Sequence, residues 1–298
     1  MKWKWLTALF PLGLAAIFSI LLNTGRIDNP IIYVKADLGT LLLFVGFVLS
    51  VLVGAGWALN DWAEHYNQNA QALAADERRR FLRRLDHELK NPLTAIRAGL
   101  ANISEAPSPE ARRSALESVE AQALRLSRLS SDLRKLAELE TRSVDRAPVD
   151  IAELLQEVFA LAQDRGESED RHLSLTIPQA PWPLPKISGD QDLLFLAVHN
   201  LLDNAIKFTQ PGNTVEIRAF EDGSSVVVEV ADTGPGIPEE EVPHVWEELY
   251  RGKGARGVPG SGLGLALVRA IVEMHNGQVI IRSREGQGTV ISLRLPLG

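Results

Sequence analysis

The sequence predicts a membrane anchor of two transmembrane helices, an α-helical hairpin that dimerises into a four-helix bundle, and an α/β sandwich. Three observations predict this order. Two long runs carry no charged residue, two later segments space apolar residues three or four apart, and the last part of the chain mixes helical and alternating patterns. The predicted domains are the anchor (1–62), a helical linker (63–75), the hairpin (76–145) and the sandwich (146–298).

Composition excludes several classes of protein. The chain has 298 residues, a length typical of about two domains. It has no cysteine, which excludes a disulfide scaffold, a cysteine-ligated zinc site and a thiol nucleophile. Its net charge of -7 comes from 31 basic and 38 acidic residues, so we expect no direct contact with nucleic acid.

The anchor is predicted from residues 6–22 and 38–59, two uncharged runs each long enough to cross a bilayer. A buried core helix, or for the first run a cleavable signal peptide, is the alternative. Basic residues precede the first run and follow the second, and the positive-inside rule then predicts two cytoplasmic termini. We therefore expect a multi-pass protein of the inner (cell) membrane, in contact with lipid. The basic residues are Lys2, Lys4, Arg78, Arg79, Arg80, Arg83 and Arg84.

The hairpin is predicted from two amphipathic runs separated by Pro107 and Pro109. A lone hairpin cannot bury apolar faces of this length, so we expect two copies to form a four-helix bundle. Packing of the hairpin against the C-terminal domain of its own chain is the alternative. The apolar positions are Leu82, Leu85, Leu89, Leu93, Ile96, Leu100 and Ile103 in the first run, and Leu116, Val119, Ala123, Leu126, Leu133, Leu136 and Leu139 in the second.

One candidate reactive group, His87, lies in the first hairpin helix. It is offset by two positions from Leu85 and Leu89, which predicts an outward-facing imidazole that can act as a nucleophile near neutral pH. Glu88 can accept or orient a ring proton, and Asn91 lies one turn further along. An exposed histidine on a helix is usually only solvated, so this interpretation depends on the motifs that follow.

The C-terminal region predicts an α/β sandwich with mostly antiparallel strands. Alternating patterns predict strands, and runs with helical spacing predict helices. The expected strands are 173–177, 214–220, 225–231, 279–283 and 289–295, and the expected helices are 192–208 and 263–275.

Three motifs in this region carry groups suited to phosphate and base recognition. In His199–Lys207, Asn200, Asn204 and Lys207 present amide oxygens and an ammonium along one helix edge, which suits Mg²⁺ and phosphates. In Asp232–Pro238, a carboxylate at a strand end can accept a hydrogen bond from an amine, and glycines let a ring approach the backbone.

The third motif, Gly260–Leu265, opens a helix whose free N–H groups can bind phosphate. The glycine-rich segment before it, Arg251–Pro259, is typical of a mobile lid. Each motif alone is weak evidence for a nucleotide site, but the order and spacing of the motifs together are a specific signal.

These motifs resemble those of bacterial membrane-bound sensor histidine kinases of two-component systems. The run HELKNPL resembles the H box of that family, NLLDNAIKFT the N box, DTGPGIP the G1 box, GSGLGLALV the G2 box, and Val245–Arg251 the F box with Trp246 in place of phenylalanine. The resemblance covers about residues 76–298 and implies a HisKA-type dimerisation domain followed by a Bergerat (GHKL/HATPase) ATP-binding fold.

The resemblance also implies roles for single residues. His87 would accept the phosphoryl group of ATP, with Glu88 as its acid/base partner, and Asn91 would assist dephosphorylation of the regulator. Asn204 would bind Mg²⁺, with Asn200 nearby. The ATP site would comprise Asn200, Asn204, Lys207, Asp232, Gly234, Gly236, Arg251, Gly260, Gly262 and Gly264, with Lys207 and Arg251 on the phosphates and Asp232 on the adenine amine.

The implied activity is ATP-dependent autophosphorylation in a homodimer, followed by phosphoryl transfer to an aspartate of a response regulator. The alternatives are a degenerate ATP-binding scaffold, a sensor that acts mainly as a phosphatase, and a GHKL-type ATPase whose hydrolysis drives motion. Only residues 60–86 separate the second span from His87, too few for a HAMP or PAS domain. We therefore expect sensing within the membrane or through a partner membrane protein, such as a sensor or transporter.

Overall fold

The computed structural model describes two units of the chain, Met1–Leu73 and Ala74–Gly298. The described residues are 38–105, 108–164, 171–178, 182–255 and 257–297. In the first unit they form the N-terminal part of helix α2 (Leu38–Glu105). The first predicted transmembrane span, residues 6–22, lies outside the described residues.

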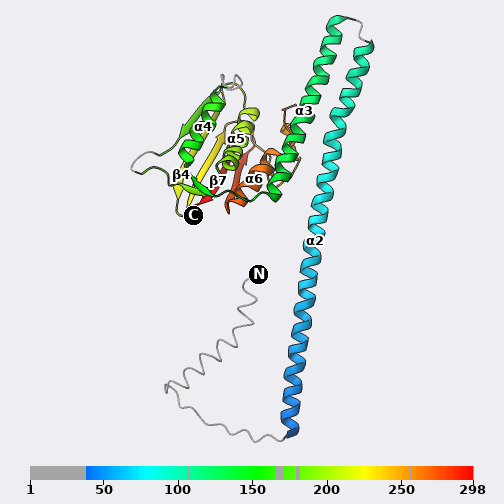
Figure 1. Ribbon diagram of the computed structural model, residues 1–298, viewed down its shortest axis with the longest axis vertical. Coiled ribbons are helices and arrows are strands. Elements are labelled where there is room, and N and C mark those ends of the chain that lie inside the picture. The colour runs from blue at the N-terminus through cyan, green and yellow to red at the C-terminus, as the bar shows by residue number, and fades with distance from the viewer. Residues whose placement is uncertain (1–37, 106–107, 165–170, 179–181, 256, 298) are drawn as a thin grey trace. The chain divides into compact units, whose positions relative to one another are not determined.

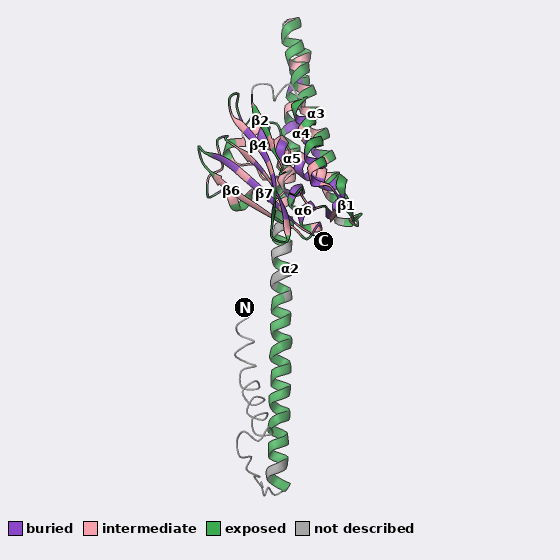
Figure 2. Ribbon diagram, turned by 90° about the vertical axis from the view of Figure 1, so that its left-hand side faces the viewer, coloured by how far each residue is buried: buried purple, intermediate pink, exposed green. Residues whose placement is uncertain are grey.

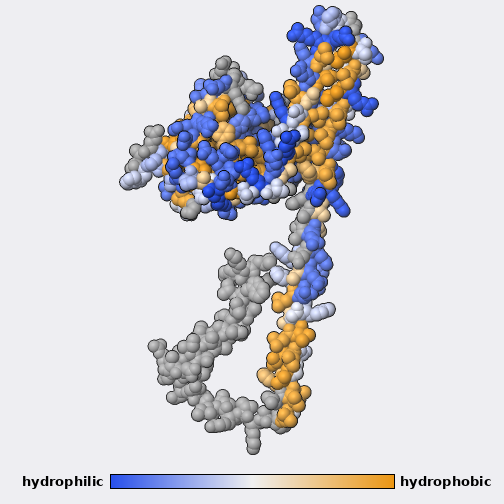
Figure 3. Space-filling view, viewed as in Figure 1, coloured by the Kyte–Doolittle hydropathy of each residue, from blue (hydrophilic) through white to orange (hydrophobic). Residues whose placement is uncertain are grey.

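The N-terminal part of α2 contains one segment, Leu42–Tyr66, that is long and apolar enough to cross a membrane. This segment overlaps the second predicted span, residues 38–59. Its described side chains are exposed (Figure 2), and apolar residues dominate its surface (Figure 3). Among the described residues it is the one helix with this length and composition.

In the second unit, α2 pairs with α3 (Pro109–Thr141) to form the predicted helical hairpin. The break predicted at the two prolines is confirmed, because α2 ends at Glu105 and Ser108 caps α3 by accepting a hydrogen bond from the Ala111 N–H at 3.2 Å. The helices approach closely at Gly99, where an added Cβ would lie 2.5 Å from Val119. A larger residue at this crossing would therefore force the Val119 side chain to shift.

The apolar face of the hairpin is only partly covered within one chain. Leu89 and Leu93, which the sequence predicts on the face buried in a four-helix bundle, are 37% and 51% exposed within the single chain. Figure 3 shows apolar side chains along the hairpin. The exposed leucines on its two helices are Leu82, Leu89, Leu93, Leu100, Leu116 and Leu124.

The remaining residues form an α/β sandwich built on a five-stranded sheet. Its strands run in the order β2 (His172–Thr176), β4 (Thr214–Asp222), β5 (Ser225–Asp232), β7 (Gly288–Pro296) and β6 (Gln278–Arg284). Only the β2–β4 pair of this sheet is parallel. A separate antiparallel pair joins β1 (Ala147–Val149) to β3 (Ile187–Gly189).

Helices cover one face of the sheet (Figure 1): α4 (Ile151–Gln163), α5 (Gln191–Phe208) and α6 (Gly264–Met274). Carboxylates fix the starts of two of them, because Asp150 accepts from the Ala152 N–H and Asp190 from the Leu193 N–H, each at 3.1 Å. The predicted strands and the two predicted helices agree with the structure to within about two residues. Helix α4 and the β1–β3 pair were not predicted.

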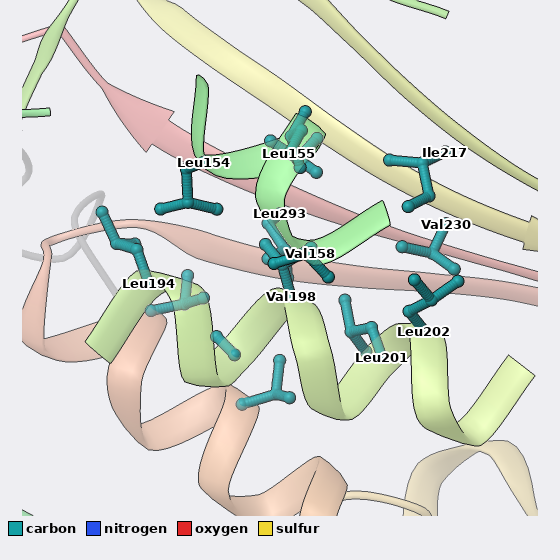
Figure 4. Packing of buried hydrophobic residues seen from close by; sticks show 14 of the residues in the cluster. Leu154, Leu155, Val158, Leu194, Val198, Leu201, Leu202, Ile217, Val230 and Leu293 are labelled. Atoms are coloured by element: carbon teal, nitrogen blue, oxygen red, sulfur yellow. The ribbon is translucent and has the colours of Figure 1, made fainter. Parts of the chain in front are cut away.

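The core lies between these helices and the sheet. Figure 4 shows side chains from α4 and α5 packed toward side chains of β4, β5 and β7. Burial of these aliphatic groups supplies the main stabilisation of the domain, and it fixes α5 so that the opposite edge of that helix stays accessible. The labelled residues are Leu154, Leu155, Val158, Leu194, Val198, Leu201, Leu202, Ile217, Val230 and Leu293.

Candidate functional site

The first part of the site is the exposed His87 on α2. Its imidazole is exposed, as the sequence predicted, and Asn91 is exposed one turn further along. Glu88 is half-buried because its side chain turns toward α3, where Arg125 Nη2 donates to Glu88 Oε2 at 2.7 Å. The helix continues through Pro92 without ending there.

The second part is the accessible edge of α5. Leu201 and Leu202 anchor the helix in the core, and Asn200 and Asn204 stay half-exposed. The Asn200 amide donates from Nδ2 to the Leu196 carbonyl at 2.7 Å, which leaves Oδ1 to accept from elsewhere. One turn along this helix, Lys207 pairs with Asp203 at 2.5 Å.

Gly264 brings the third motif against this edge. A Cβ added at Gly264 would lie 3.3 Å from Asn200 Oδ1 and 3.6 Å from Asn204 Nδ2. The absence of a side chain there keeps both amides accessible at the start of α6. Two motifs that are 60 residues apart in the sequence are therefore adjacent.

Asp232 ends β5 and forms the third part of the site. Its Oδ1 accepts from the Gly234 N–H at 2.9 Å, and burial raises the pKa of the carboxyl group above its ordinary value, although backbone hydrogen bonds from Gly234 and Thr289 oppose the shift. Thr289 faces Asp232 in the β5–β7 register. Thr289 was not predicted as a neighbour of Asp232, because this pairing depends on the sheet register.

The turn after Asp232 requires its glycines. Gly236 has φ +67°, and an added Cβ would lie 2.1 Å from the Arg284 carbonyl oxygen. A Cβ on Gly234 would lie 2.9 Å from Asp232 Oδ1 and 3.0 Å from the Phe208 carbonyl oxygen. The close approach of backbone segments explains why glycine occupies both positions.

The predicted lid, residues 251–259, is held by Arg251. The Arg251 guanidinium donates from Nη2 to the carbonyl oxygens of Ala255 and Val258, each at 2.6 Å. In this conformation Arg251 organises the lid through backbone contacts. After the lid, Gly260 is exposed with nothing within 4 Å of an added Cβ, whereas Gly262 has φ +76° and lies against Leu249 and Tyr250.

The residues that flank the lid on both sides contact the hairpin. Arg84 of α2 forms an ion pair with Glu247 and lies 5.7 Å from the centre of the Tyr250 ring. Beyond the lid, Ser261 donates from Oγ to Asp132 of α3 at 2.6 Å. Leu129 of α3, Leu249 and Leu263 form a small buried cluster at the same contact.

These contacts were not predicted residue by residue. Packing of the hairpin on its own C-terminal domain was one of the alternatives, and part of the hairpin surface does pack there. Trp246, the substituted F-box position, packs on the main core of the sandwich.

The residues that could hold a metal ion here are Asn200 and Asn204, through their side-chain amide oxygens. Among the described residues, no group of three or more histidine, cysteine, aspartate or glutamate side chains could hold a metal ion. Gly264 leaves both amides uncovered, and their side-chain oxygens are ligands of the kind that Mg²⁺ prefers. Phosphate and water oxygens would complete such a shell.

Family comparisons match both parts of this site. Residues 77–142 match the family model "His Kinase A (phospho-acceptor) domain", and residues 189–298 match "Histidine kinase-, DNA gyrase B-, and HSP90-like ATPase". The chain belongs to the sensor histidine kinases of two-component systems. His87 and Glu88 lie in the first matched segment, and the three nucleotide-type motifs lie in the second.

Individual sensor kinases show the same relationship. The signal transduction histidine-protein kinase BaeS of Escherichia coli is 30% identical over 99% of this chain and 63% of its own length. The kinase/phosphatase MprB of Mycobacterium ulcerans is 35% identical over 78% of this chain and 47% of its own length. The chain thus spans about half to two thirds of the length of such relatives.

One solved structure is similar to this chain in both sequence and fold. Full-length ShkA in complex with AMPPNP is 30% identical, with a TM-score of 0.53 over 72% of this chain and 45% of ShkA. The similarity in sequence and fold extends over both the hairpin and the sandwich, since neither alone makes up this share of the chain.

Proposed function

We propose that this histidine kinase uses ATP to phosphorylate His87 in a homodimer and then passes the phosphoryl group to an aspartate of a response regulator. The observation that carries the proposal is an exposed imidazole on a helical hairpin, in the same chain as an α/β sandwich whose N, G1 and G2 motifs converge. BaeS and MprB, which are named as histidine-protein kinases, support it.

The reaction at His87 is a direct displacement at phosphorus. The ring nitrogen Nε2 forms a bond to the γ-phosphorus of ATP while the bond from that phosphorus to the β–γ bridging oxygen breaks, and ADP leaves. The Nδ1 proton passes to the Glu88 carboxylate and then to water. Such transfers depend on positioning and charge neutralisation more than on covalent assistance.

The residues of the sandwich would supply that positioning. Asp232 would accept a hydrogen bond from the adenine amine, with Gly234 and Gly236 letting the ring approach. Lys207 would contact the phosphates once it leaves Asp203, and Asn204, with Asn200 beside it, would hold Mg²⁺. The bound Mg²⁺ would neutralise phosphate charge.

The lid and the G2 segment would complete this pocket. Arg251 would contact the phosphates after exchanging its lid carbonyls for phosphate oxygens. Gly260, Gly262 and Gly264 would allow the backbone of the G2 segment to approach the nucleotide. ShkA in complex with AMPPNP supports nucleotide binding at this fold.

The dimer and the membrane anchor belong to the same proposal. The exposed leucine stripe on α2 and α3 would be buried against the hairpin of a second copy, which gives a four-helix bundle. Leu42–Tyr66 would cross the inner membrane in contact with lipid, as one of two spans that leave both termini in the cytoplasm. A partner membrane protein could deliver the signal.

A second activity, dephosphorylation of the regulator, is favoured by Asn91. This amide is exposed one helical turn from His87, where it can position a water molecule on an incoming aspartyl phosphate. MprB is named as both kinase and phosphatase. Loss of regulator dephosphorylation in Asn91→Ala, with self-labelling intact, would support this assignment.

The test is labelling of the full-length protein with γ-labelled ATP and Mg²⁺ in lipid nanodiscs. We expect acid-labile, alkali-stable label on the protein, lost in His87→Gln and retained in His172→Gln, which replaces an exposed histidine of β2. Label that survives His87→Gln would overturn the assignment of the acceptor. Nucleotide binding without any label would favour a scaffold.

A further inference from the structure

Arg125 has a position that the motifs do not explain. It lies on α3, yet its guanidinium reaches across the hairpin to the carboxylate that follows His87, with 2.7 Å between Nη2 and Glu88 Oε2. The side chains of Arg125 and Glu88 are 36% and 20% exposed, so the pair is partly withdrawn from water. A charge-assisted hydrogen bond in such a place fixes geometry better than one at a fully exposed surface.

The ion pair uses only one of the two carboxylate oxygens. Within the described part of the chain, Arg125 is the one polar partner of Glu88, and it binds Oε2. Glu88 Oε1 therefore remains able to accept a second hydrogen bond. The nearest group in the sequence that can donate one is the exposed imidazole of His87.

Without Arg125, the Glu88 side chain would sample several rotamers. Adjacent residues of a helix point about 100° apart, so a carboxylate at position 88 does not face the ring at position 87 unless something orients it. A glutamate side chain loses considerable rotamer freedom when it is fixed. The contact from α3 fixes the carboxylate before ATP arrives.

We propose that Arg125 is a positioning residue that acts on His87 through Glu88. It binds Oε2 and presents Oε1 to the Nδ1–H of the imidazole, so that Nε2 carries the lone pair that attacks phosphorus. As the nitrogen–phosphorus bond forms and ADP leaves, the Nδ1 proton moves to Oε1. The inference rests on the proposed function, since it concerns the same transfer step.

The location of Arg125 separates this role from nucleotide binding. It lies on α3, and its described polar contact is with Glu88 and not with any residue of the ATP-type motifs. Its loss should slow the chemical step and leave the ATP concentration dependence unchanged. A residue that only stabilised the hairpin would not give this separation.

The experiment measures single-turnover labelling of His87 in the full-length protein over a range of ATP concentrations. Arg125→Gln should lower the maximal rate about tenfold or more, because a general base contributes about 10²–10⁴-fold and is here misplaced but not removed. The KM for ATP should stay unchanged, and Arg125→Lys should recover part of the rate. The matched control is Arg134→Gln, an exposed arginine on the opposite side of α3, which should label like wild type.

A double-mutant cycle with Glu88→Gln completes the test. In the Glu88→Gln background, Arg125→Gln should cause no further loss, since the carboxylate that it positions is gone. Wild-type labelling by Arg125→Gln, or losses that multiply in the double variant, would overturn the inference. The proposed function would survive either result as long as His87→Gln abolishes the label, and it fails separately if the wild-type protein gives no label on His87.

Discussion

Gly262 offers the sharpest test of the structure around the lid. Its φ is +76°, and an added Cβ would lie 2.8 Å from the Tyr250 carbonyl oxygen and 3.0 Å from Leu249. The left-handed conformation alone costs an L-residue about 1–2 kcal/mol. The contact adds to this cost because Leu249 is buried and cannot move aside freely. Gly262→Ala should therefore destabilise the domain by about 2 kcal/mol or more.

The assay is thermal unfolding of the full-length protein, together with equilibrium binding of ATP. A loss of about 2 kcal/mol corresponds to a fall in Tm of roughly 4–8 °C for a unit of this size. Weaker ATP binding should accompany it, because Gly262 lies between the lid and α6.

Two other glycines provide matched controls for Gly262. Gly260→Ala should change the Tm little, since Gly260 has no positive φ and nothing lies within 4 Å of an added Cβ. Gly257→Ala has φ +85° and open space, so it should show the conformational cost alone. Equal Tm values for Gly262→Ala and Gly260→Ala would refute this reasoning.

Two further predictions concern charged groups and follow from the pKa directions. Burial raises the pKa of Asp232 in the folded protein, so ionising this carboxyl group destabilises the fold. The protein is therefore most stable with respect to this group below its ordinary pKa of about 3.9, and that stability is lost as the pH rises through the pKa of Asp232 in the folded state. Asp232→Asn should thus raise the Tm of the ATP-free protein at pH 7 but not at pH 3, and should weaken ATP binding. Although burial alone would raise the pKa of Glu247, hydrogen bonds with His244 and Arg84 hold it below its ordinary value, and this stabilisation is lost as the pH falls through the folded-state pKa. Arg84→Gln should therefore cost at most about 1 kcal/mol at pH 7, since both side chains are about one-third exposed, and the Tm difference from wild type should vanish in acid.

The parts of the fold that local sequence patterns determine were predicted well. The N-box helix was expected at 192–208 and occurs at Gln191–Phe208, because its apolar spacing and its aspartate cap are local signals. Helix α4 had comparable signals, the cap at Asp150 followed by apolar residues at helical spacing, and these were overlooked.

The parts that depend on distant segments could not be predicted. The Arg84–Glu247 pair joins residues 163 positions apart, and nothing in either local sequence specifies the other partner. The Glu88–Arg125 contact depends on the register of the hairpin, which the crossing at Gly99 and Val119 sets. The sequence identified His87, Asn204 and Asp232 as candidates, but their neighbours required the structure.

The lid is attached to the hairpin at both of its ends, through Glu247 before it and Ser261 after it. A segment with two fixed ends has already lost the entropy of loop closure, so ordering it around a nucleotide costs less than ordering a free flap. The same attachments couple two equilibria, nucleotide binding and hairpin docking. Thermodynamic linkage requires that if docking changes nucleotide affinity by some factor, the nucleotide changes docking by that same factor. The coupling free energy can therefore be obtained in either of two ways: by measuring nucleotide affinity with the hairpin docked and undocked, or by measuring hairpin docking with and without the nucleotide.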